Sequence, residues 1–239
     1  MLRKYLLILV SWLGLSAAQA TPLTQVQAVP DVPQAFGFKT QWLAVKTTSP
    51  QAVLALLPLH NIQPANWQSG LNAVAQADYR SDTQPVFITP AVNGWVFVVC
   101  SMSIPALDTD SGWQQLNAFT APLLKQFGEV QYFGSYRVTN YVAWAKAEKG
   151  QWIRRFAWSD GQITELYGQQ TDAEKMLKLP DIRSNEDLAD ERLFEQWLAS
   201  FDEETPHKLA GFWGIDPEKL PKMGLLPSTG WLADVKIKP

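Results

Sequence analysis

Short β-rich runs separated by turn dipeptides constrain the fold of this chain more than any other feature. Residues 136–146, 151–158 and 163–167 are rich in aromatic and β-branched side chains, and Lys149-Gly150 and Asp160-Gly161 separate them. Such dipeptides accept the positive φ angles of tight turns that reverse a strand. With the β-rich stretch around Val130 and Tyr132 before them, these runs predict an antiparallel meander.

A second hairpin is expected earlier in the chain. Residues 85–89 and 95–101 are β-rich and flank Asn93-Gly94, the strongest short-range hairpin signal. Residues 41–46 and 231–238 have the composition of further strands.

Helical segments alternate with these strands. Apolar side chains recur at three- and four-residue spacing from Trp113 to Phe127, with Asp110 or Ser111 as the capping residue and Gly128 as the terminator. Further helices are expected at residues 50–57, 67–77, 171–177, 186–201, 205–213 and 217–220. The helix at 171–177 is expected to begin with a capping box of Thr171 and Glu174. The chain is therefore predicted to be an α+β protein, with an antiparallel meander sheet packed against helices on one face.

The first twenty residues have the layout of a secretory signal peptide. Arg3 and Lys4 precede an apolar stretch at 5–15, and Ala18-Gln19-Ala20 supplies the small residues of a cleavage site. A membrane span needs about 20 residues, and this stretch is shorter, which argues against an uncleaved membrane anchor. We expect cleavage after Ala20, a periplasmic location and no membrane insertion of the remaining chain.

Three segments are then expected along the chain: residues 1–20 as signal peptide, 21–38 as lead-in and 39–239 as a single α+β domain. Pro22, Pro30 and Pro33 predict that the lead-in is extended and poorly ordered.

Charge excludes one class of partner. The chain has 20 basic and 23 acidic residues, and loss of Arg3 and Lys4 with the signal peptide leaves 18 basic residues and a net charge of −5. Nucleic-acid binding needs a basic face to replace the counterions of phosphates, so no nucleic-acid partner is expected. A soluble protein or one with a basic partner fits this balance better.

Motifs for metal, nucleotide or nucleophilic chemistry are missing from the sequence. His60, His207 and Cys100 are the only histidines and the only cysteine, and no zinc or phosphate-binding motif is present. Cys100 ends the apolar run 95–99, so we expect a buried thiol rather than a dyad with either imidazole. We expect no catalytic residue, no metal and no cofactor, hence a binding protein rather than an enzyme.

Carboxylates leave one enzymatic alternative open. Glycosidase chemistry needs only two of them, and Glu129, Glu148 and Glu165 lie at predicted strand ends. Solvated positions are the more ordinary role for each, and Glu129 is expected to pair with Arg137 across the meander.

An acidic segment supplies the candidate binding residues. Residues 181–204 hold nine acids against Arg183 and Arg192. They form either a docking face for a basic partner or the solvated side of an amphipathic helix. The candidates for binding are Asp187, Asp190, Glu191, Glu195, Asp202, Glu203 and Glu204.

Several segments resemble a bacterial family that is similar to the immunity partners of secreted toxins. The most specific is Phe-Gly-Glu-Val-Gln-Tyr-Phe at 127–133, and the others lie at 95–99, 136–138, 141–145 and 210–217. The chain departs from the family at Ser135-Tyr136-Arg137, where a histidine close to the arginine is expected, and in its export signal. The resemblance implies no catalytic residue.

Together these features predict a periplasmic immunity protein that neutralises a basic toxin by occlusion. Two alternatives stay open: a cell-envelope hydrolase, either a glycosidase or an amidase, and an envelope assembly factor.

Overall fold

The computed structural model describes residues 26–78, 80–101, 104–109 and 111–236 of the chain. The expected signal peptide at residues 1–20 lies outside the described residues. Among the helices in the described ranges, none is long and apolar enough to cross a membrane.

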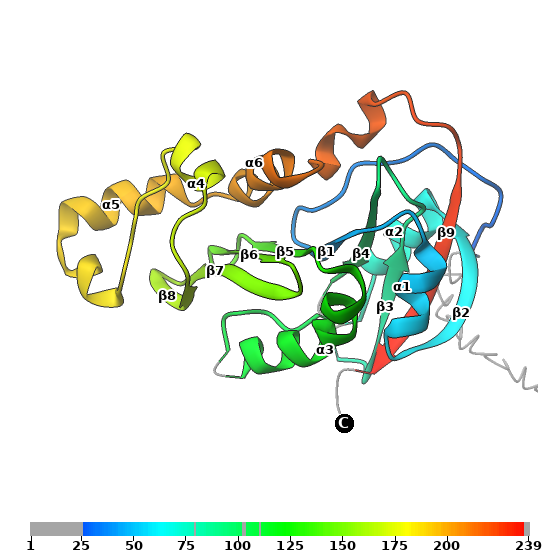
Figure 1. Cartoon of the computed structure of the whole chain (residues 1–239), viewed down its shortest axis with the longest axis horizontal. Coiled ribbons are helices and arrows are strands. Elements are labelled where there is room, and N and C mark those ends of the chain that lie inside the picture. Colours follow the sequence, from blue (N-terminus) through cyan, green and yellow to red (C-terminus); the bar gives the residue numbers. More distant parts are fainter. Residues whose placement is uncertain (1–25, 79, 102–103, 110, 237–239) are drawn as a thin grey trace, which may run out of the picture.

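One antiparallel sheet organises the molecule (Figure 1). Its strands are β1 (Gln41–Lys46), β2 (Leu59–Asn66), β3 (Thr83–Ile88), β4 (Trp95–Cys100), β5 (Val130–Tyr136), β6 (Tyr141–Glu148), β7 (Gln151–Ser159), β8 (Gln162–Tyr167) and β9 (Thr229–Lys236). Their order across the sheet is β2-β9-β3-β4-β1-β5-β6-β7-β8. The predicted meander is confirmed, because β5 to β8 are successive antiparallel neighbours.

The predicted turn dipeptides adopt the conformations that their sequences favour. Both residues of Asn93-Gly94, Lys149-Gly150 and Asp160-Gly161 have φ between 47° and 85°. Each pair joins neighbouring antiparallel strands, so local turn chemistry fixes three of the strand reversals.

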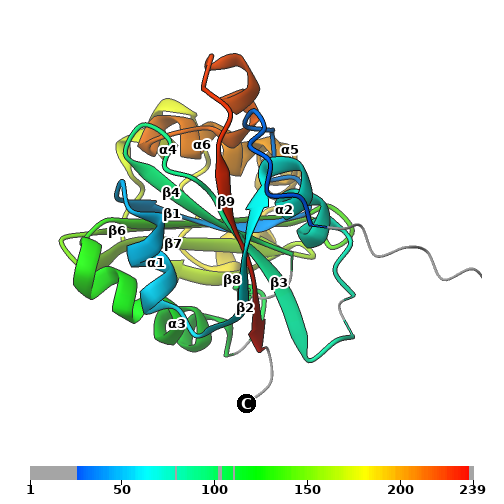
Figure 2. The same cartoon turned by 90° about the vertical axis from the view of Figure 1, so that its right-hand side faces the viewer.

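Helices cover both faces of the sheet, so the prediction of helices on one face is wrong (Figure 2). α1 (Pro50–Leu56) and α3 (Gly112–Phe127) pack on one face. The other face carries α2 (Trp67–Ala75), α4 (Asp172–Met176), α5 (Glu191–Ser200), α6 (Glu204–Trp213) and two 3₁₀ helices, η1 (Asn185–Ala189) and η2 (Pro217–Lys222).

Strand β1 explains this double covering. Trp42 and Ala44 belong to the core under α2 and α6, whereas Leu43 and Val45 belong to the core under α1 and α3. Successive strand side chains point to opposite faces, and here both sets are apolar and buried. An apolar strand of this kind requires a cover on each side.

One predicted helix is divided in the structure, and one observed strand was not predicted. The helix expected at 186–201 is divided into η1 and α5, because Asp190 has an extended backbone with ψ of 107°. Strand β2 was not expected, since its sequence is polar and contains Pro64. It lies at the edge of the sheet, where proline and polar side chains are tolerated.

The described part of the lead-in, residues 26–38, is packed against the domain. The backbone N–H of Asn66 donates to the carbonyl of Gln27, and Asp31 pairs with Ser228 in a β-bridge. Phe36 is buried in the core under α2. The expectation of poor order is therefore wrong for this segment, because long-range contacts hold it.

Candidate functional site

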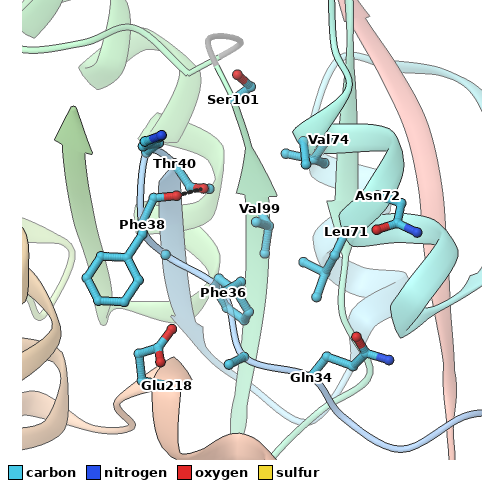
Figure 3. A pocket seen from close by; sticks show the side chains of 14 residues that line it. Gln34, Phe36, Phe38, Thr40, Leu71, Asn72, Val74, Val99, Ser101 and Glu218 are labelled. Carbon is cyan, nitrogen blue, oxygen red and sulfur yellow. Dashed lines mark hydrogen bonds between the residues drawn. The ribbon is translucent and has the colours of Figure 1, made fainter. Parts of the chain in front are cut away.

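A pocket of about 430 Å³ opens between the lead-in, α2 and the end of β4 (Figure 3). Apolar side chains form most of its inner wall: Phe36, Val74 and Val99 are buried, and Leu71 packs against the same core. Polar side chains surround the opening, namely Gln34, Lys39, Thr40, Asn72, Ser101 and Glu218. An apolar interior with a polar margin is typical of binding sites that are formed before the ligand arrives.

Asp31 fixes the lead-in to the start of α2. Its two carboxylate oxygens accept from the backbone N–H groups of Trp67 and Gln68, at 2.7 and 2.9 Å. These amides have no partner within the helix, and a carboxylate also suits the positive end of the helix dipole. These hydrogen bonds thus link the lead-in to α2, and the two segments form two walls of the pocket.

Gly37 allows the lead-in to pass close to the core. Its φ is 124°, and a Cβ added there would lie 2.3 Å from Cε1 of His207. Its carbonyl accepts a hydrogen bond from the Ser135 hydroxyl at 3.3 Å. No larger residue fits this backbone path without moving the imidazole.

A buried histidine and a buried aspartate lie next to the lead-in and η2, on the core side of the pocket wall. Nδ1 of His207 lies 3.2 Å from Oδ1 of Asp216, and the imidazole packs against the rings of Phe38 and Trp42 at 4.5 and 5.2 Å. Asp216 also accepts from the backbone N–H of Glu218, which places Glu218 at the pocket margin.

The environment of Asp216 sets its protonation. Burial alone would raise the pKa of this carboxyl, but hydrogen bonds from His207 and the Glu218 amide, with the charges of His207 and Lys219, hold the pKa below its usual value. Nε2 of His207 is buried, has no hydrogen-bond partner among the described residues, and faces the backbone of Gly37. The pair therefore supports the wall of the pocket from inside the core.

Three of the seven predicted binding acids accept hydrogen bonds from backbone N–H groups that are close to them in the sequence. Asp187 accepts from the N–H groups of Arg183 and Ser184, and Asp190 accepts from that of Arg192. Asp202 accepts from the N–H groups of Glu204 and Thr205 at the start of α6. These carboxylates lie near the ends of helices, where acidic side chains often bind free backbone N–H groups.

The other four acids differ in exposure. Glu204 forms an ion pair with Lys208 at 3.0 Å, and this hydrogen bond raises the pKa of Lys208. Glu203 is half-buried, and Glu191 and Glu195 are exposed on α5. Of the seven predicted acids, Glu191 and Glu195 are exposed members of α5.

Cys100 is a buried thiol, as predicted. Its Sγ lies 3.5 Å from the carbonyl oxygen of Gln41, to which it donates. His207 is engaged with Asp216, and His60 is exposed on the edge strand β2. A buried thiol in apolar surroundings is unreactive.

The expected pairing of Arg137 with Glu129 is wrong. Glu129 precedes β5 and Arg137 follows it, so the two lie at opposite ends of a strand of seven residues. Such a strand spans about 23 Å, far beyond the reach of an ion pair. Arg137 is exposed in the turn before β6.

A buried ion pair that was not predicted from the sequence fixes α4 to the sheet. Arg154 of β7 lies 2.8 Å from Glu174, and both side chains are almost fully buried. The indole of Trp144 donates to the same carboxylate, and Thr171 donates to it from its backbone and its hydroxyl. The predicted capping box of Thr171 and Glu174 is confirmed, but its link to Arg154 has no local signature.

Comparison with known proteins gives this site no counterpart. No family model, curated protein or solved structure matches the chain. The described residues also contain no cluster of three or more histidine, cysteine, aspartate or glutamate side chains placed to hold a metal ion. The pocket is therefore interpreted from its own geometry.

Proposed function

We propose that this chain is an exported binding protein of the immunity type, which neutralises a basic toxin by covering it. In this proposal an apolar side chain of the toxin enters the pocket between the lead-in and α2. The acidic segment around η1 and α5 contributes charge complementarity.

The pocket is the observation that carries the proposal. Its inner wall is apolar and already formed, and Phe38 stands at its margin with 43% of its surface exposed. Aromatic side chains beside small preformed pockets are typical of the few positions that dominate binding energy in protein interfaces. The lead-in is held at Asp31 and Gly37, so little ordering is needed when a partner binds.

The acidic segment supports the choice of a basic partner. The buried residues of the pocket wall and those of α5 belong to the same hydrophobic core, on the same face of the sheet. Glu191 and Glu195 are exposed on α5. Exposed charges of one sign speed the encounter with a partner of the opposite sign and suppress wrong partners.

Competition between sibling bacteria tests this function. A strain that lacks the gene should be outgrown by its parent when the two are in contact, and the full chain should restore its growth. A chain without residues 2–20 should fail to restore growth, because the proposal requires export. Equal growth of the deletion strain and its parent under all contact conditions would contradict the proposal.

Charge reversal tests the acidic segment separately. Replacement of Glu191 and Glu195 by lysine should slow association with the toxin by about tenfold at low salt, as is usual for charges around an interface. The matched control is Asp172→Lys on α4, whose side chain is 96% exposed and lies outside the segment. Equal rates for the double variant and the control would remove the acidic segment from the docking face.

A further inference from the structure

A second cavity, of about 410 Å³, lies between the edge strand β8 and the start of α3. Its polar lining combines two carboxylates, two amides, two hydroxyls and an indole. These belong to Asp108, Glu165, Gln114, Gln162, Thr109, Thr164 and Trp113. α3 packs on the face of the sheet opposite α5 and α6, so the cavity is separate from the docking pocket (Figure 1).

Arg155 holds two of these side chains in place. Its guanidinium lies 3.6 Å from the centre of the Trp113 ring and 4.2 Å from that of Tyr167. Its Nε donates to Oε1 of Glu165 at 2.9 Å. The arginine is thus stacked between two rings while it orients the carboxylate, an arrangement that its planar cation favours.

Trp113 is further fixed by a second indole. The ring of Trp152 meets it edge to face at 5.5 Å, and the Trp152 N–H donates to Asn117 of α3. One wall of the cavity is therefore a rigid aromatic surface before any ligand arrives. Rigid walls lower the entropic cost of binding.

The polar side chains that line the cavity favour some classes of ligand over others. Amides and hydroxyls both donate and accept hydrogen bonds, whereas carboxylates accept. A sugar hydroxyl also does both, so this mixture matches a polyol. A phosphate or another acidic ligand is disfavoured, because Asp108 and Glu165 line the cavity and the nearby Arg155 is already paired with Glu165.

We propose that this cavity between β8 and the start of α3 binds a neutral saccharide. Gln162, Thr164 and Glu165 on β8 hydrogen-bond its hydroxyls, and Trp113 contacts the apolar C–H groups of a ring. The cavity volume lies within the range of about 300–1,000 Å³ that small-molecule sites occupy. This site is additional to toxin binding and does not depend on it.

Titration calorimetry of the purified protein with two neutral probes, triacetylchitotriose and cellotriose, tests the proposal. At least one trisaccharide should bind with saturable heat. Gln162→Ala, at an exposed position of β8, should weaken that binding by about fivefold, the usual loss for one hydrogen bond. Trp113→Ala should weaken it more, and circular dichroism would show whether that variant stays folded.

Gln151→Ala is the matched control, because Gln151 is also an exposed strand glutamine but lies outside the cavity. Its affinity should equal that of the unaltered protein. The proposal is overturned if neither trisaccharide binds, or if Gln162→Ala binds as tightly as Gln151→Ala. Because the readout is saccharide binding alone, the result is independent of the competition between siblings.

Discussion

At the scale of single residues, Gly37 is the position where the lead-in and the core meet most closely. We predict that Gly37→Ala lowers the free energy of unfolding by about 2–4 kcal/mol, from overpacking against His207 and from the strained φ of 124°. Gly94→Ala is the matched control: its φ is 85°, but no atom of the described residues lies within 4 Å of the added Cβ. It should lose about 1–2 kcal/mol, from backbone strain alone.

Urea denaturation of both variants measures this difference. Equal losses at Gly37 and Gly94 would show that the lead-in does not lie against His207 in solution.

Asp216 makes stability depend on pH at the acid end. Its pKa is held below the ordinary value in the folded protein, so the unfolded chain takes up its proton more readily. The stabilisation from Asp216 is therefore fully present above the unfolded pKa of about 4 and is lost as the pH falls through the lower, folded value. We predict that Asp216→Asn unfolds more easily at pH 7 and loses less stability than the unaltered protein below pH 4.

Unfolding free energies measured between pH 2.5 and pH 7 check this expectation. Parallel curves for the variant and the unaltered protein would contradict the assignment of acid sensitivity to Asp216.

At the scale of elements, the start of α2 holds the lead-in through one carboxylate. We predict that Asp31→Ala costs about 1–2 kcal/mol of stability, the range for lost helix caps, because two amides at the start of α2 lose their acceptor. Hydrogen exchange should rise at Trp67 and Gln68 and along residues 26–38. Unchanged protection of the lead-in in this variant would mean that Phe36 and Gly37 alone hold it.

Elements that depend on nearby residues were predictable, and those that depend on distant ones were not. The meander, the hairpin at Asn93-Gly94 and the capping box at Thr171 follow from turn and cap chemistry within a few residues. Strand β2 was missed because its pairing with β9 joins residues far apart in the sequence, and its own composition is polar. The break at Asp190 was missed because apolar spacing continues through it.

At the scale of the whole molecule, the candidate site could not be predicted from the sequence. The pocket combines the lead-in, α2, β4 and η2, which only the folded arrangement brings together. No local signal in the sequence shows that Asp31 caps a distant helix. The acidic segment, by contrast, was visible as a run of charge, and only its helix-capping roles needed coordinates.

In the proposed function, the pocket beside α2 receives a side chain of a protein partner. Ala75 is exposed and lines this pocket, whereas the neighbouring Gln76 is exposed outside it. Ala75→Trp should therefore fill the opening without disturbing the core, and Gln76→Trp provides a control of equal size.

The most direct test is the dissociation constant between the protein and the basic toxin proposed as its partner, measured by titration calorimetry. We predict that Ala75→Trp weakens binding at least about thirtyfold, the loss expected when a central interface pocket is blocked, while Gln76→Trp binds as tightly as the unaltered protein. Equal, undiminished affinity of both tryptophan variants would contradict the account.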